Sequence, residues 1–345
     1  MKRKLFLCTL AGSAAGLVFG DPVSDFLASA VREPHPGRVG LAEVGQVRAL
    51  AQMFARQDHG FVGGLSAEAV VTQLSVSANL LDGRFSYEAV RLQLFSAMAE
   101  LADVAAGMCF DAGAHGQAQQ CFQFAVGCAT EAGDWAMRAK ALSGLANLAV
   151  HGGQRDDALS MAEMALVRAD RLPPVTRAVM YTRHARALGL NGVHREPDCL
   201  AATDQAEQHF AAGTGDEPSW MAYYTCAHLE RDIGRALLHL AVNGGDPTKA
   251  QARLQAAVTS FPAKPSRGKT LAIANLAHVT MSRDDPAHAA ALGHTALDAM
   301  ATVRSDRVFA ALRQVRVAGQ RHSRIAAVAE LNQRLDGALP GTVIS

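Results

Sequence analysis

One run of this sequence has the residue types of a phosphate-binding loop. Residues 263–270 read Ala-Lys-Pro-Ser-Arg-Gly-Lys-Thr, and such loops hold phosphates with backbone N–H groups at the start of a helix. That chemistry needs a buried strand leading into a glycine-rich turn. Here residues 254–261 have the pattern of a helix end, Pro262 and Pro265 occupy the turn, and alanine replaces the first glycine. We interpret the run as a loop that starts a helix.

Histidine and cysteine are the next residues that could do chemistry. The 13 histidines are scattered, and His288 and His294, six residues apart, do not share a helical face well. Neither a His-Glu-x-x-His motif nor a paired-cysteine spacing for zinc occurs. A Gly-x-Ser-x-Gly nucleophile elbow is also absent. The six cysteines, of which Cys121 and Cys128 have the spacing of a buried helix face, favour free thiols in a reducing compartment. We predict no enzyme activity, no cofactor and no metal site.

Glycine-punctuated helices organise most of the chain. From about residue 100, a glycine is followed five residues later by an Ala-x3-large-x2-Ala pattern: Gly113 precedes Ala118, Phe122 and Ala125; Gly153 precedes Ala158, Ala162 and Ala165; Gly245 precedes Ala250, Leu254 and Ala257. Weaker copies include Ala289, Gly293 and Ala296, and Ala202 and Ala206. Positions 0, 4 and 7 lie on one helical face, so small residues there let two helices of a hairpin pack closely. The period is near 40 residues.

This pattern predicts an all-α fold of tetratricopeptide-like helical hairpin repeats that form a right-handed α-solenoid. We expect a basic and hydrophobic N-terminal segment and linker at 1–38, helices packing on the array at 39–100, and the repeat array with C-terminal capping helices at 101–340. In such an array the first helices of successive hairpins line a concave groove that suits a peptide.

Six residues on these first helices are candidate peptide-binding residues. Asn147 and Asn275 both occur in the sequence Ala-Asn-Leu-Ala, and an asparagine amide can pin a peptide backbone because it both donates and accepts hydrogen bonds. Comparable helices carry four further candidates, which are Tyr181, His184, Tyr224 and His228. The alternative is that these six are ordinary exposed polar residues or half-buried rings between hairpins.

Several loose motifs, in their order along the chain, resemble a known family. They are residues 58–64 (Asp-His-Gly-Phe-Val-Gly-Gly), 106–113, 181–187, 220–224 and 293–297. Together they resemble the C-terminal tetratricopeptide-like region of actinobacterial Xre-family transcriptional regulators, over roughly Val39 to Leu339. The resemblance implies a regulatory function. In that family a helix-turn-helix domain precedes this region, and no such domain is found here; residues 66–81 lack the basic recognition helix that could replace it.

The charge balance argues against direct nucleic-acid binding. The 33 basic and 32 acidic side chains give a net charge of +1, whereas binding through phosphates requires a marked basic excess. One local excess lies near the C-terminus, where acidic residues are few. We interpret it as the exposed face of a capping helix; its arginines are Arg304, Arg307, Arg313, Arg316, Arg321, Arg324 and Arg334.

The first 20 residues leave the location of the protein open. Lys2-Arg3-Lys4 precedes an apolar stretch from Leu5 to Gly20, which is the layout of a secretory signal and is too short for a comfortable membrane span. A linker is the competing interpretation. We expect a cytoplasmic regulatory scaffold or sensor that binds a peptide, a protein or a small signal, without a membrane span and with homodimerisation through the N-terminal helices as an option. The alternative is an exported helical-repeat binding protein.

Overall fold

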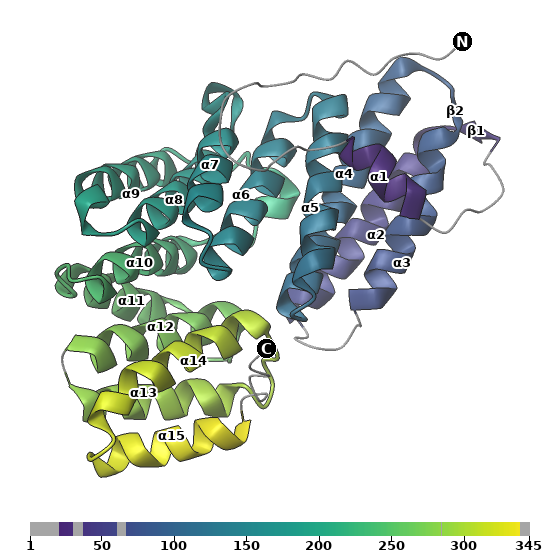
Figure 1. Cartoon of the computed structure of the whole chain (residues 1–345). Coiled ribbons are helices and arrows are strands. Elements are labelled where there is room, and N and C mark those ends of the chain that lie inside the picture. The colour runs from purple at the N-terminus through teal and green to yellow at the C-terminus, as the bar shows by residue number, and fades with distance from the viewer. Residues whose placement is uncertain (1–20, 30–36, 61–66, 284, 339–345) are drawn as a thin grey trace.

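The fold is all-α, as the sequence predicts (Figure 1). A computed structural model describes residues 21–29, 37–60, 67–283 and 285–338. Apart from helices, the described residues contain one parallel pair of two-residue strands, β1 (Arg38–Val39) and β2 (Arg84–Phe85). The sequence predicts no strands. These two strands pair the loop before α2 with the loop before α4.

The N-terminal elements are α1 (Pro22–Ser29), α2 (Leu41–Gly60), α3 (Ala67–Ala78), the 3-10 helix η1 (Asn79–Asp82), α4 (Glu88–Asp111), α5 (His115–Ala132), α6 (Trp135–His151) and α7 (Arg155–Leu166). The remaining elements are η2 (Ala169–Arg171), α8 (Pro174–Leu190), η3 (Val193–Arg195), α9 (Glu196–Ala211), η4 (Ser219–Met221), α10 (Cys226–Val242), α11 (Thr248–Ser260), α12 (Arg267–Arg283), α13 (Pro286–Ala299), α14 (Asp306–Gly319), η5 (Gln320–His322) and α15 (Ala326–Ala338).

Glycines set the turns between paired helices. Gly113 and Gly153, with φ of 78° and 72°, occupy the left-handed region that favours glycine. The predicted turns at both positions are therefore confirmed. Gly133 ends α5 in the same conformation, and Asp134 then caps α6 by accepting a hydrogen bond of 2.9 Å from the backbone N–H of Met137.

Small residues let the helices of a pair approach closely. The predicted alanines Ala118 and Ala125 in α5, and Ala158 and Ala165 in α7, are fully buried. Gly144 in α6 lies so close to the ring of Phe122 that an added Cβ would be 2.2 Å from it. The alanine and glycine spacing thus corresponds to real contact faces.

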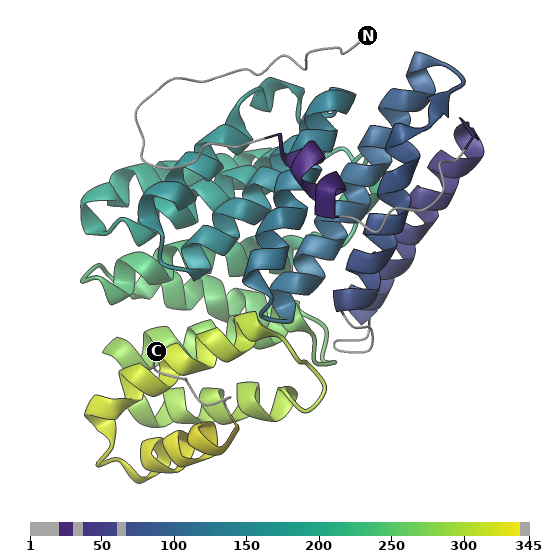
Figure 2. The same ribbon diagram turned by 45° about the vertical axis from the view of Figure 1, so that its right-hand side comes forward.

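Six helices form a row that encloses the middle of the molecule. We call α4, α6, α8, α10, α12 and α14 the inner row: each packs against the next, and α14 also contacts α4 (Figures 1 and 2). Five helices, α5, α7, α9, α11 and α13, pack against the inner-row helices that precede them. The inner row therefore curves until its last helix meets its first.

Asp111, the last residue of α4, makes the contact that closes the inner row. Its carboxylate accepts hydrogen bonds from the guanidinium of Arg307 on α14, with Nε at 2.8 Å, and from Ser305. Nη1 of Arg267, at the start of α12, lies 2.5 Å away. These partners are 156 to 196 residues apart in sequence, so the closure exists only in the folded chain.

Three features differ in detail from the sequence-based boundaries. The helix α1 lies within the segment expected as a linker, and it packs on α5 with the rings of Phe26 and Phe124 stacked at 4.3 Å. The helix α2 continues to Gly60, although the sequence Asp58-His59-Gly60 predicts a helix break there, and α4 spans the predicted domain boundary between residues 100 and 101. Residues 1–20, which carry the signal-like pattern, lie outside the described residues.

One described helix, α4, is long and apolar enough by length and composition to cross a membrane. In the folded chain its apolar side chains are largely buried against α2, α3, α5 and α6. A buried core helix of this length and composition satisfies the same criterion.

A close contact between α8 and α10 gives a test of the inner row. An added Cβ on Gly189 would be 2.5 Å from the carbonyl oxygen of Ala236, so Gly189→Ala must push two helix backbones apart. We expect a loss of about 2 kcal/mol in the free energy of unfolding, measured by urea denaturation. In Gly107→Ala, where nothing lies within 4 Å of the added Cβ, stability should stay equal or rise by about 0.5–1 kcal/mol. Equal stability of the two variants would contradict the packing described here.

Candidate ligand-binding site

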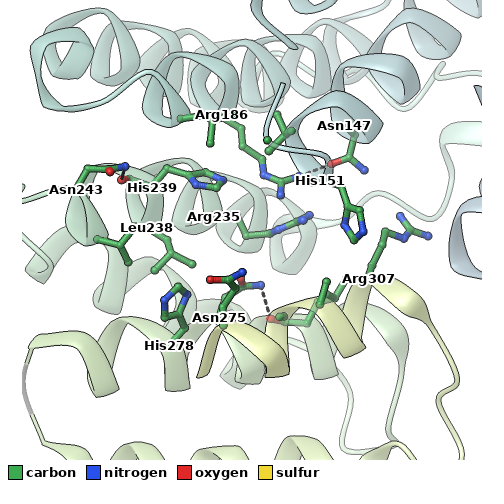
Figure 3. Close-up of a pocket in the computed structure, with 18 of the residues that line it drawn as sticks. Asn147, His151, Arg186, Arg235, Leu238, His239, Asn243, Asn275, His278 and Arg307 are labelled. Atoms are coloured by element: carbon green, nitrogen blue, oxygen red, sulfur yellow. Dashed lines mark hydrogen bonds between the residues drawn. The ribbon is translucent and has the colours of Figure 1, made fainter. Parts of the chain in front are cut away.

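A pocket of about 350 Å³ lies at the centre of the inner row. Every inner-row helix contributes to its wall, and the side chains converge on one space (Figure 3). Leu190, Leu238, Val242 and Leu271 supply apolar surface. This size and mixture of apolar and polar walls are typical of pockets that hold a small ligand or part of a larger one.

Positive charge dominates the polar part of this wall. Among the described lining residues are Arg155, Arg186, Arg235 and Arg307, together with three histidines, and none is Asp or Glu. Arg186 on α8, Arg235 on α10 and Arg307 on α14 reach the same pocket from three helices (Figure 3). The whole chain has a net charge of only +1, so the local excess arises from placement and not from composition.

The buried carboxylate of Asp232 lies beside three arginines. Arg231 donates to its Oδ1 at 2.8 Å, Arg183 lies 3.2 Å from Oδ2, and Nη1 of Arg235 is 3.9 Å from Oδ1. Burial opposes ionisation of Asp232, but Arg183, Arg231 and Arg235 outweigh it and hold the pKa of this carboxyl below its usual range. One negative charge therefore serves several guanidinium groups.

Two of the pocket arginines keep unsatisfied hydrogen-bond donors. Arg186 is 9% exposed and Arg235 is 8% exposed, yet the Nε of each has no hydrogen-bond partner. Arg186 donates from Nη1 to Oδ1 of Asn147, a neutral acceptor. Burial, and then the neighbouring Arg183, lowers the pKa of Arg186 to about 9; burial and Arg186 lower the pKa of Arg235 as well. Both cations are thus held in an unfavourable environment.

The two deeper histidines of the pocket are neutral near pH 7. Burial lowers the pKa of His278 to about 4. Burial, together with Arg186 and Arg235, lowers the pKa of His239 well below its usual value. They therefore offer a ring nitrogen as donor or acceptor to a ligand, without adding charge.

Asn147 and Asn275, two of the six candidate residues, both line the pocket. Asn147 is 8% exposed and accepts the hydrogen bond from Arg186. Asn275 donates from Nδ2 to the carbonyl oxygen of Leu271, one turn back on α12, at 2.6 Å. The structure brings these two amides to one space although they are far apart in sequence.

The other four candidates do not line the pocket. The ring of Tyr181 stacks on His209 at 5.4 Å, and His184 is half-buried near Glu163, Arg195 and Asp198. Tyr224 is buried and lies in the loop before α10, not on a helix as expected, with its hydroxyl donating to Asp232 at 3.4 Å. His228 completes the capping box that starts α10.

A group with the composition of a metal site lies beside the pocket. His115, His151 and Asp306 place their ligand atoms within 4.8 Å of one another. Oδ2 of Asp306 is 3.1 Å from Nε2 of His115 and 3.2 Å from Nε2 of His151, while Arg313 binds Oδ1. The hydrogen bond from His151, against the opposing effect of burial and with help from Arg313, lowers the pKa of Asp306 to about 2. In this arrangement the group joins α5 and α6 to α14.

The arginines that define the pocket are not among the residues that the sequence predicts for the site. The cluster of C-terminal arginines was interpreted as an exposed face, which is wrong for Arg307, whose side chain binds Asp111 and lines the pocket. The available signal was helical spacing: Arg231 and Arg235 are one turn apart in α10, and His239 follows after another turn. Charges repeated on an otherwise buried helix point to a polar site.

The loop-like run at residues 263–270 leads into the first turn of α12. Nζ of Lys269 donates to the carbonyl oxygen of Pro262 at 3.0 Å. The only strands in the described ranges, β1 and β2, pair with each other and are far in sequence from residues 263–270. The preceding element is the helix α11, so the interpretation as a helix-starting loop is confirmed.

Comparison of the chain with protein-family models, with curated proteins and with solved structures gives no match in any of the three.

Asp232→Asn should strongly destabilise the chain. The substitution keeps the shape but leaves buried guanidinium groups without their shared carboxylate. We expect the free energy of unfolding to fall by about 3–5 kcal/mol, measured by urea denaturation. The control is Asp198→Asn, whose exposed carboxylate pairs with Arg195 at 2.7 Å; it should change stability by less than about 1 kcal/mol. A D232N chain as stable as the control would show that Asp232 does not hold these charges.

Acid should destabilise the chain through His278. Its pKa is about 4 in the folded chain, against a usual value of 6.5, so between these values only the unfolded chain binds the proton. Its contribution to the free energy of unfolding is complete above about pH 6.5 and falls by about 3 kcal/mol as the pH falls toward 4. Denaturation across this range should show less acid sensitivity in His278→Gln than in the exposed control His288→Gln. The same acid sensitivity in both variants would contradict the assignment.

Proposed function

We propose that this chain is a regulatory scaffold that binds a segment of a peptide or protein in the pocket of the inner row. The observation that carries the proposal is the convergence of six inner-row helices on one pocket with both polar and apolar walls. The description that fits this arrangement best is a right-handed α-solenoid of tetratricopeptide-like hairpins, in which first helices line the binding surface.

The two asparagines support recognition of a peptide backbone. Asn147 and Asn275 lie on α6 and α12, on the wall of the same pocket (Figure 3). Amide groups on separate helices can hydrogen-bond successive peptide units of an extended segment, whatever its side chains are. The apolar surface of Leu238 and Leu271 then favours burial of an aliphatic or aromatic side chain.

The size of the pocket limits what enters it. A volume of about 350 Å³ lies at the lower end of the range for ligand pockets. It suits a chain terminus, a single side chain or a small signal, and not a whole helix. We infer that the rest of a partner would contact the rim.

Regulation would follow from the way the helices are connected. A ligand that contacts α8, α10 and α14 at once bridges helices that are distant in sequence, and this favours one relative arrangement of the pairs. The resemblance to the repeat region of Xre-family regulators supports transcription as the process that is controlled. A partner protein would read the change in helix arrangement.

Selection from a displayed library of random peptides against the immobilised chain tests this proposal. We expect a set of related peptides to be enriched, and their affinities can be measured by fluorescence anisotropy. Ala310→Phe places a ring in the pocket wall and should weaken binding at least about ten-fold. Ala252→Phe, at an exposed position of α11, is the matched control and should bind normally. No enrichment, or equal binding by both variants, would reject the pocket as a peptide site.

A further inference from the structure

The buried positive charge around the pocket exceeds its neutralising partners. Arg183, Arg186, Arg231 and Arg235 lie around one carboxylate, that of Asp232. Arg183 and Arg231 take its two oxygens, at 3.2 Å and 2.8 Å, and the hydroxyl of Tyr224 shares one of them. The guanidinium groups of Arg186 and Arg235 are left without a carboxylate at hydrogen-bonding distance in the described part of the chain.

These two guanidinium groups are also the ones that line the pocket. Within the described residues, the hydrogen-bond acceptor of Arg186 is the neutral side chain of Asn147. For Arg235, the nearest carboxylate oxygen within the described ranges is Oδ1 of Asp232, at 3.9 Å. The Nε atoms of both are buried and unpartnered. Each is more than nine-tenths buried, so water gives little compensation.

Such an arrangement is costly in a protein interior. A buried cation without a paired anion loses its hydration, and two like charges in one pocket also repel. Structural arginines normally have a carboxylate at hydrogen-bonding distance, as Arg267 and Arg307 do at Asp111. Unbalanced buried charge with free donors is typical of a site whose counter-charge arrives with a ligand.

We propose that the pocket recognises an oxyanion on its ligand, a carboxylate or a phosphate, and that Arg186 and Arg235 are the residues that bind it. This inference rests on the proposed function, because it names the chemical group that the pocket accepts. A guanidinium presents two N–H groups in a planar fork that matches two oxygens of a carboxylate or a phosphate. Arg307 and the neutral His239 line the same space and add donors for the remaining oxygens.

The residues that line the pocket also favour an anionic ligand over a cationic or a neutral one. A cationic ligand would meet the pocket arginines with no acidic lining residue among those described. A neutral ligand would leave the Nε donors of Arg186 and Arg235 unsatisfied. Only an anion removes both costs, and its binding should therefore stabilise the folded chain.

The test uses the purified full chain and three probes, which are sodium pyrophosphate, sodium citrate, and a peptide enriched in the selection, made with a free C-terminal carboxylate, an amidated C-terminus or a phosphoserine. Calorimetry gives the affinities, and thermal unfolding gives the stabilisation, at low and high salt. We expect at least one oxyanion probe to bind and to raise the Tm. Comparison of pyrophosphate with citrate, and of the three peptide forms, identifies which oxyanion is preferred.

Two variants assign the binding to the arginines. Arg235→Gln and Arg186→Gln should each weaken oxyanion binding at least about ten-fold, while Arg195→Gln, which removes an exposed arginine paired with Asp198, should not. Without ligand, R235Q should unfold at the same Tm as the wild type or higher, because an unneutralised buried charge has been removed. An arginine with a purely structural function would instead lower the Tm when replaced.

Either of two results would overturn the inference. In the first, the wild type binds no oxyanion probe. In the second, every probe that binds the wild type binds R186Q and R235Q equally well. This failure is distinct from failure of the proposed function. Peptides that bind equally well to R235Q and to the wild type would support the peptide site and reject the oxyanion site. If R235Q abolishes pyrophosphate binding and no peptide is enriched in the selection, the result would support the oxyanion site and reject the peptide site.

Discussion

The closure of the inner row at Asp111 is the interaction on which the pocket depends. A row of helices that pack only on their neighbours would leave an open surface. Here the carboxylate at the end of α4 binds Ser305, Arg307 and Arg267 from the far end of the chain. Asp306 adds bonds to His115 and His151. Because α14 is fixed against α4 and α6, the space between the inner helices becomes a walled pocket.

Within that wall, the chain separates charges that keep the fold together from charges that stay available. Asp111 is paired with Arg267 and Arg307, and Asp306 is paired with Arg313. Asp232 holds Arg183 and Arg231, and this leaves Arg186 and Arg235 facing the pocket with unpartnered nitrogen atoms. The same residue type therefore stabilises the scaffold in one place and, in our proposal, binds the ligand in the other. What distinguishes them is the distance to a carboxylate.

The proposed peptide and oxyanion sites use neighbouring parts of one surface. The amides of Asn147 and Asn275 suit a backbone, and the arginines suit a charged group attached to it. Asn147 also accepts the hydrogen bond of Arg186, so a ligand that engages the guanidinium affects the amide as well. Binding at α8 and α10 would in this way reach α6 and α12. A small ligand could thus change the arrangement of helices on both sides of the pocket.

The sequence by itself determined the helices and many of their contact faces. Glycine at the turns and alanine at positions 0, 4 and 7 are local signals, because a left-handed turn or a close helix contact restricts the residue type at that position. For this reason the turns at Gly113 and Gly153 and the buried alanines of α5 and α7 could be predicted. Ends of helices are marked less clearly in the sequence, and α2 continues through residues 58–60, where the sequence predicts a break.

The tertiary structure alone decided which charges meet. Arg186, Arg235 and Arg307 are ordinary helix residues in the sequence, and the net charge of +1 hides them. Arg307 even belongs to a run of arginines that is typical of an exposed helix. Whether an arginine faces water, a carboxylate or a pocket depends on helices up to 196 residues away, and no local pattern encodes that distance. The pocket is therefore a property of the closed row.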